Sequence, residues 1–316
     1  MNYFAILLPN LIKFLIFISV GYGVSRFGVI RREGLPTIAS MLINVLLPLL
    51  VVSIMAQHGT TFMDLLSYRK MIAGQLFGYF FLTVSGILVS NMLGLTGTTR
   101  NVHQGCMVGG NYAYIVIPLI LAMFPVDDGQ QYIPICSAVD TITVWTLTIS
   151  LFTRGIDTGE KSRLAMIGRK LLHPVMVAIL TMLTLNSLSV EVPAPIMDAC
   201  SELGGICASL SLVYVGAMIF FMQIGSIQLI RNASVMALTK LLIAPMIIYA
   251  VVSRFLPETE SIILMLVAGC PTYTIGCAIT EQYKLDTDYA ATIIFVTTVG
   301  CLVTIPLLFM FVSLIG

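Results

Sequence analysis

The chain has 316 residues, of which 58% are hydrophobic and only 10% are charged, whereas about 25% of the residues of a soluble domain are charged. So few charges cannot cover the surface of a water-soluble globule, and a mean hydropathy of +1.00 excludes a disordered chain. A net charge of +1 without a basic run excludes a nucleic-acid binder. The composition is that of an all-α polytopic membrane protein, whose partner is the lipid bilayer.

Ten apolar segments are long enough to cross a bilayer as helices, which takes about 20 residues each. In chain order they are 4–25, 36–56, 71–93, 102–124, 132–153, 171–189, 203–225, 233–253, 260–280 and 289–315. The longest polar connection, 154–170, divides the chain nearly in half. We therefore expect a first five-helix repeat at 1–155, a cytoplasmic loop at 156–170 and a second five-helix repeat at 171–316.

The positive residues are distributed unevenly between the two sides of the expected bundle. Loops after the odd-numbered spans carry eleven of the sixteen Lys and Arg residues, whereas the opposite side has only Arg69, Lys70 and Arg254. Positively charged loops stay in the cytoplasm. We therefore expect a multi-pass protein of the cell (inner) membrane with both termini on the extracytoplasmic side.

The two halves carry unusual features at matching positions. The fourth span contains GNYAYIVIP at 110–118, the ninth contains CPTYTIG at 270–276, and a shift of 160 residues places Asn111 on Pro271. Because each half has five spans, the second half is inverted. Inverted halves with matching Gly- or Pro-interrupted spans indicate a secondary transporter. Where the interruptions meet, half-helix N-termini attract an anion.

The residues around these interruptions are the candidates for substrate binding. The Asn111 amide offers two donors and an acceptor to a carboxylate, or alternatively caps its own broken helix. Asn44 lies on one helix face with Pro48, where it lines the cavity or hydrogen-bonds a neighbouring helix. The complete predicted set is Gly110, Asn111, Tyr112, Tyr114, Pro118, Pro271, Thr272, Tyr273 and Asn44.

Three ionisable residues, Lys13, Asp140 and Lys240, lie well inside the spans, where such residues normally face the protein interior and have a function. Asp140 and Lys240 are predicted either to form a buried ion pair or to leave Asp140 free to take up a coupling proton. Lys13 alternatively extends its ammonium to the membrane surface.

Several ordered motifs resemble the auxin efflux carrier family. The likeness is carried by INVLLPLL (43–50), GNYAYIVIPL (110–119), KLLIAPMI (240–247) and CPTYTIGCAITEQYKLDTDYAATIIF (270–295), and it covers essentially the whole chain. The resemblance implies two inverted repeats whose broken helices four and nine cross. It also implies a scaffold made of helices one, two, six and seven, a transport domain that slides like an elevator, and a homodimer.

The short central loop departs from the plant members, so a small carboxylate such as malate or malonate fits better than auxin. The homodimer would form through spans two and seven. Span seven contains small residues that permit close helix approach. They are Gly204, Gly205, Ala208, Gly216 and Ala217.

The leading functional hypothesis is a secondary carrier of a small organic anion that works by an elevator mechanism, with or without protons as coupling ions. The alternatives are a sodium-coupled symporter of the bile-acid carrier type, which shares the inverted-repeat fold, and a membrane receptor that binds a ligand without moving it. The sequence contains no nucleophile–base pattern, no phosphate loop and no metal-ligand spacing among its seven cysteines. It therefore predicts neither an enzyme nor a bound metal or cofactor.

Overall fold

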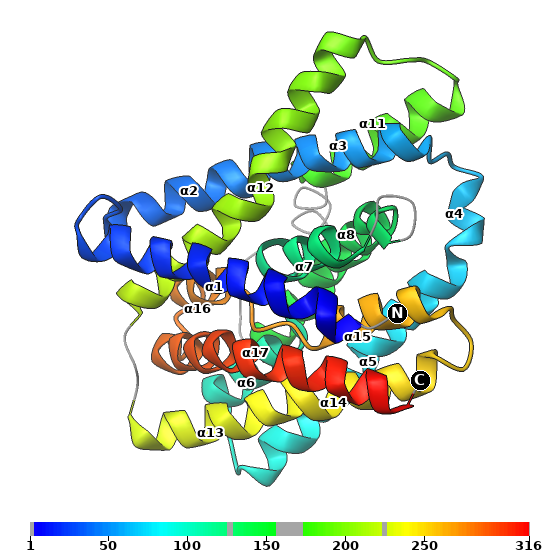
Figure 1. Cartoon of the computed structure of the whole chain (residues 1–316). Helices are drawn as coiled ribbons and strands as arrows, with labels where there is room; N and C mark the ends of the chain where they lie inside the picture. Colours follow the sequence, from blue (N-terminus) through cyan, green and yellow to red (C-terminus); the bar gives the residue numbers. More distant parts are fainter. Residues whose placement is uncertain (1–2, 125–128, 156–172, 223–225, 316) are drawn as a thin grey trace.

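The structure, a computed structural model, describes residues 3–124, 129–155, 173–222 and 226–315 (Figure 1). The predicted loop 156–170 therefore lies outside the described residues. Six described helices are long and apolar enough to cross a membrane, and the described ranges contain no β-strand beyond one isolated bridge. The predicted class, an all-helical protein with several membrane-spanning helices, is confirmed.

The helices of the first half are interrupted at several places. The segment from α2 (Leu35–Met41) runs through the π turn η2 (Leu42–Leu46) into α3 (Leu47–His58). Likewise, α8 (Tyr132–Thr143) continues through η5 (Val144–Thr148) into α9 (Ile149–Phe152). The other elements are α1 (Tyr3–Arg26), η1 (Arg32–Gly34), α4 (Asp64–Ser67), α5 (Arg69–Met92), α6 (Gly97–Val108), η3 (Tyr112–Val116) and α7 (Ile117–Met123).

The second half repeats this mixture of continuous and interrupted helices. Here α13 (Ile227–Leu238) continues through the π turn η6 (Thr239–Ile243) into α14 (Ala244–Val252). The other elements are α11 (Pro174–Ser187), α12 (Ala194–Phe221), α15 (Glu258–Ala268), α16 (Ile275–Gln282) and α17 (Thr287–Ile315).

Three of the π turns have a common sequence cause. Each of η2, η3 and η6 ends two residues before a proline, namely Pro48, Pro118 and Pro245. Proline has no N–H and its ring collides with the carbonyl four residues earlier, so the turn before it widens. Pro118 frees the carbonyl of Tyr114, which accepts a hydrogen bond from the Ser211 hydroxyl of α12 at 3.3 Å. The widened turn therefore remains hydrogen-bonded within the protein.

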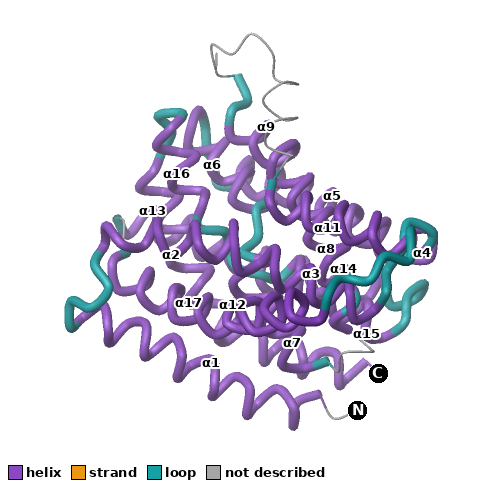
Figure 2. Tube along the Cα trace, turned by 90° about the horizontal axis from the view of Figure 1, so that it is seen from above, coloured by secondary structure: helices purple, strands orange, loops and turns teal. Residues whose placement is uncertain are grey.

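The helices pack in two groups. In the first, which we call the α12 group, α12 contacts α1 and the α2–α3 segment, and α11 contacts α3. In the second, the α17 group, α17 contacts α13 and α16, α14 contacts α15, and α5 contacts α6, α8 and α15 (Figure 1). Both chain ends lie on the same side of the molecule in two perpendicular views (Figure 2).

Close contacts inside the α12 group use two glycines of α12. A Cβ atom on Gly216 would collide with the backbone of Ile18 in α1, and one on Gly204 would collide with the backbone of Leu50 in α3. The sequence suggested these glycines for a dimer contact, but both serve packing within one chain. A Cβ on Gly205 would meet no atom within 4 Å. The homodimer stays a prediction.

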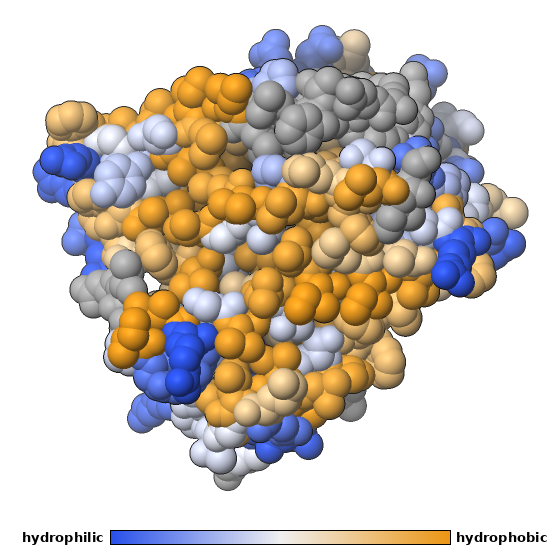
Figure 3. Space-filling view, turned by 60° about the horizontal axis from the view of Figure 1, so that its bottom comes forward, coloured by the Kyte–Doolittle hydropathy of each residue, from blue (hydrophilic) through white to orange (hydrophobic). Residues whose placement is uncertain are grey.

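Apolar side chains spread over a large part of the surface, with hydrophilic residues gathered near the margins of the face shown in Figure 3. Exposed apolar residues occur on α5, α13 and α17, for example Phe80, Val235 and Val303. Such surfaces are unfavourable in water and are expected where helices face lipid.

Candidate functional site

The two interrupted helices meet at their breaks. The first break separates α6 from η3, and the second separates α15 from α16. Gly110 and Thr272 form an isolated antiparallel bridge, and the Asn111 N–H donates to the Pro271 carbonyl at 2.7 Å. The two interruptions therefore meet, as the resemblance implied, and the two positions that the 160-residue shift aligns, Asn111 and Pro271, are in main-chain contact.

Close approach at this junction requires glycine at two positions. A Cβ atom on Gly109 would collide with the ring of Tyr273, and a Cβ on Gly110 would collide with the Cys270 sulfur. The side chains of the second break therefore occupy the space that larger residues at 109 and 110 would fill. This explains the glycine pair directly before Asn111.

Lys240 hydrogen-bonds the C-terminal end of α6. Its ammonium is completely buried and donates to the carbonyls of Cys106 and Gly109 at 2.9 and 2.7 Å. The Thr272 hydroxyl also donates to the Cys106 carbonyl at 2.9 Å. Carbonyls at a helix C-terminus have no partner within the helix and carry its negative dipole end, so a buried cation is well placed there.

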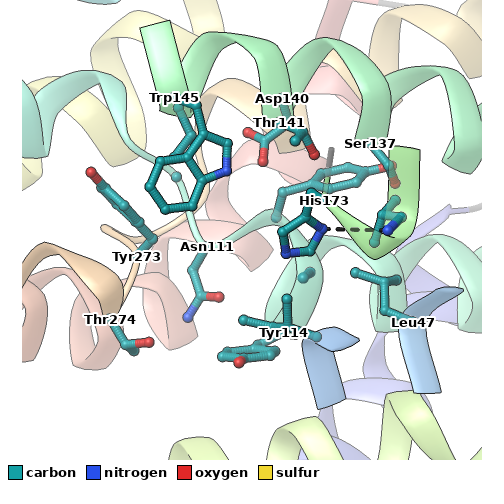
Figure 4. A pocket seen from close by; sticks show the side chains of 16 residues that line it. Leu47, Asn111, Tyr114, Ser137, Asp140, Thr141, Trp145, His173, Tyr273 and Thr274 are labelled. Atoms are coloured by element: carbon teal, nitrogen blue, oxygen red, sulfur yellow. Dashed lines mark hydrogen bonds between the residues drawn. The ribbon is translucent and has the colours of Figure 1, made fainter. Parts of the chain in front are cut away.

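A cavity of about 90 Å³ lies beside the junction, between the α12 group and the α17 group (Figure 4). The α12 group contributes residues of η2, α3 and α11, and the α17 group contributes both breaks together with α8 and η5. Its lining residues are Ile43, Leu47, Gly110, Asn111, Tyr112, Ala113, Tyr114, Ser137, Asp140, Thr141, Val144, Trp145, His173, Val175, Tyr273 and Thr274.

Asn111 presents an unused donor at this cavity. Its side chain is only 3% exposed, and its Nδ2 has no hydrogen-bond partner among the described residues. Figure 4 shows the amide pointing toward Tyr114 and Thr274, with the Trp145 ring on the opposite side. A buried donor without a partner costs about 1–3 kcal/mol. The Nδ2 of Asn111 is therefore available to donate a hydrogen bond to a ligand that supplies an acceptor.

The predicted tyrosines lie at the cavity, but in different hydrogen-bonding states. The Tyr112 hydroxyl donates to the Ile133 carbonyl at 3.2 Å, and the Tyr114 hydroxyl to the Ala39 carbonyl at 3.5 Å. The Tyr273 hydroxyl is buried and has no partner among the described residues. Three other predicted binding residues, Pro118, Pro271 and Thr272, do not line the cavity.

Asp140 also lines the cavity, but it does not pair with Lys240. Its carboxylate accepts a hydrogen bond from the Tyr79 hydroxyl of α5 at 2.7 Å. Gln75 supports this arrangement, because its amide donates to the Tyr79 oxygen at 3.4 Å and to the Cys136 carbonyl at 3.1 Å. The hydrogen-bonding partners of Lys240 are the two carbonyls of the broken helix. The ion pair, one of two predicted roles for Asp140, is therefore not formed.

Two other predicted residues lie away from the cavity. Asn44 is exposed and its amide donates to the Ser40 hydroxyl in the preceding turn at 3.0 Å. The π turn η2 changes the helical register here, so Ile43 and Leu47 line the cavity instead. Lys13 is exposed, with its ammonium 5.9 Å from the centre of the Phe17 ring. Its exposure contradicts a buried role, and the extension of its ammonium to the membrane surface stays a prediction.

A second, wider cavity of about 780 Å³ adjoins the first. Both cavities are lined by Thr274, and the second lies among the C-terminal end of α12, the length of α16 and the N-terminal ends of α13 and α17. Sequence reasoning missed Thr274 as well as Ser137, Thr141, Trp145 and His173. The CPTYTIG motif was the only signal available for Thr274.

One comparison with known proteins, with protein families, supports the membrane class of the chain. No curated protein matches the chain. Among the described residues, no three His, Cys, Asp or Glu side chains lie close enough together to hold a metal ion. Residues 6–309 match the membrane transport protein family. The chain therefore belongs to this family, which includes the auxin efflux carriers.

Proposed function

We propose that the protein is a secondary transporter of a small organic anion of the malate or malonate type. The observation that carries the proposal is the unpartnered Nδ2 of Asn111, buried at the junction of the two broken helices. A carboxylate supplies the acceptor that this amide lacks. Because η3 and α16 both begin at the breaks, their positive dipole ends add attraction for an anion.

The size of the cavity supports a small substrate. Its volume of about 90 Å³ is well below the roughly 300–1,000 Å³ typical of pockets for drug-sized ligands. The rest of the lining combines aromatic rings with hydroxyl and imidazole groups, among them Trp145, Thr141 and His173. This combination suits a compact polar molecule that is held by few, specific contacts.

The position of the cavity between the two helix groups supports alternating access. We propose ten membrane spans in two inverted repeats, with the α12 group as the scaffold and the α17 group as the part that slides like an elevator. The wider cavity lies at helix ends that the positive-residue distribution places on the cytoplasmic side. In this scheme the described conformation faces inward, and Thr274 lies where the binding cavity adjoins the route to the cytoplasm.

Asp140 is the proposed coupling residue. A carboxylate that lines the same cavity as a bound organic anion is repelled by it, so anion binding favours the neutral, protonated Asp140. Tyr79 donates to Asp140, and the other titratable groups that line its cavity are Tyr112, Tyr114, His173 and Tyr273. Substrate and proton would then bind together and move together.

Uptake by proteoliposomes tests the proposal. Purified protein is expected to take up labelled malate or malonate, and to exchange it against the same unlabelled acid inside. Uptake should increase when the side that holds the labelled acid is made more acidic. A screen of mono- and dicarboxylates that finds neither uptake nor exchange would exclude this function.

A further inference from the structure

The carbonyl end of α6 has the features of a cation site. In secondary transporters, the unwound carbonyls and half-helix C-termini at broken helices are the groups that bind coupling cations such as sodium. Here, the Cys106 and Gly109 carbonyls converge on one point, and the Thr272 hydroxyl lies 2.9 Å from the first of them. All are located where the negative dipole end of α6 meets the second break.

The position that a metal ion would take is occupied by the ammonium of Lys240. This side chain extends from the π turn η6 and is fully buried, with 0% exposure. Its hydrogen-bonding partners are carbonyls, and its charge is not neutralised by a salt bridge to Asp140. A buried charge needs opposite charge or dipoles nearby, and here the carbonyl dipoles at the C-terminal end of α6 stabilise the ammonium.

We infer that Lys240 is a tethered substitute for an inorganic monovalent cation and conceals a latent site for sodium or a small ammonium ion. An ammonium and a sodium ion carry the same charge and are both attracted to carbonyl oxygens, so the exchange preserves the electrostatics of the broken helix. If the proposed transport function holds, it follows that no sodium ion is needed at this point of the transport cycle. The site itself does not depend on that function.

Two variants distinguish a cation site that is left empty from one that is filled by an uncharged side chain. Lys240→Ala removes the charge and leaves space, so its melting temperature in choline chloride should fall below that of the parent. Replacing choline with sodium or methylammonium at equal ionic strength should raise it, with a gain that grows with the logarithm of ion concentration, as ligand binding requires. Lys240→Met removes the charge but fills the space, so it should be destabilised without recovery by either ion.

Lys13→Ala provides the control, because this lysine also lies within an apolar helix but is exposed. Its melting temperature should not depend on the choice of cation. The parent protein is also informative, and remains so if Lys240→Ala does not fold. Its melting temperature should be the same in sodium and choline salts, and stabilisation by sodium would overturn the inference. If Lys240→Ala folds and melts at the same temperature in choline, sodium and methylammonium salts, the inference is also overturned. These measurements need no substrate, so they are independent of any failure to observe transport.

Discussion

The backbone N–H of Asn111 donates to the carbonyl of Pro271 at 2.7 Å, and this bond joins two breaks that are 160 residues apart in the chain. The bond uses only the main chain of residue 111. Its side-chain Nδ2 has no partner among the described residues. The main chain of this residue therefore serves the fold, while its side-chain N–H group is left available for the proposed role in binding.

We expect Asn111→Ala to abolish high-affinity binding of the organic anion and leave the fold intact. Loss of a charge-assisted hydrogen bond at a buried site costs about 1.5–3 kcal/mol, or roughly tenfold or more in affinity. The bond to Pro271 persists, because alanine retains the N–H. Binding is measured by calorimetry with malate and malonate, and folding by the melting temperature without ligand.

Asn101→Ala is the matched control for this variant. The amide of Asn101 is also buried, but it donates to the carbonyls of Phe152 and Arg154 at 3.2 and 2.8 Å. Its loss should lower the melting temperature and leave ligand affinity unchanged. If Asn111→Ala behaved in the same way, the Asn111 amide would serve the fold and not the substrate.

The second prediction concerns the space at the junction. Gly109→Ala places a methyl group against the Tyr273 ring, so the two breaks can no longer pack as they do. Overpacking a tight site costs about 1–3 kcal/mol. We therefore expect a lower melting temperature and loss of uptake. Gly23→Ala adds the same methyl group in open space on α1 and should change neither quantity. Uptake by Gly109→Ala at the parental rate would contradict this account of the junction.

The sequence was sufficient to predict the apolar helices and the meeting of the two breaks. Apolar segment length predicts spans directly, and the Gly and Pro positions of 110–118 and 270–276 are visible without coordinates. Asn111 and Tyr273, which the same reasoning selected as binding residues, line one cavity, and their role in binding stays a prediction.

The partners of the charged residues could not be predicted, because they depend on side-chain direction and on helix packing. One sequence shows that Asp140 and Lys240 both lie in spans, but it does not show that Lys240 reaches the end of α6. Asn44 was predicted to line the cavity on the assumption of a regular helix with 3.6 residues per turn. The π turn η2 is wider than a regular turn, so this spacing does not hold there. Trp145 and His173 carry no motif that connects them to the breaks.

The third prediction follows from the corrected position of Asn44. Asn44→Ala removes an exposed amide whose hydrogen bond stays within its own helix. Surface substitutions of this kind change the free energy of unfolding by less than about 0.5 kcal/mol. Ligand affinity, uptake and melting temperature should therefore match the parent. A marked loss of affinity would return Asn44 to the binding site and would imply a different conformation of η2 in the bound state.

The last prediction tests Asp140 as the coupling residue. Asparagine has nearly the same shape as aspartate, and its carbonyl oxygen can still accept the hydrogen bond from Tyr79. Because Lys240 is held by the carbonyls of Cys106 and Gly109, Asp140→Asn does not leave a buried cation without its partners. We therefore expect the variant to melt near the parental temperature, to bind the anion and to exchange it.

Uptake driven by a pH gradient should be lost in Asp140→Asn, because an amide cannot take up the proton. Thr141→Val, which alters a neighbouring cavity residue without changing the ionisable groups, should keep the response to the gradient even if its affinity falls. The measurement compares exchange at equal pH with net uptake under an imposed gradient in the same proteoliposomes. If Asp140→Asn retained gradient-driven uptake, the coupling proton would have to bind elsewhere. A large drop in its melting temperature would instead show that the charge of Asp140 stabilises the contact between α5 and α8.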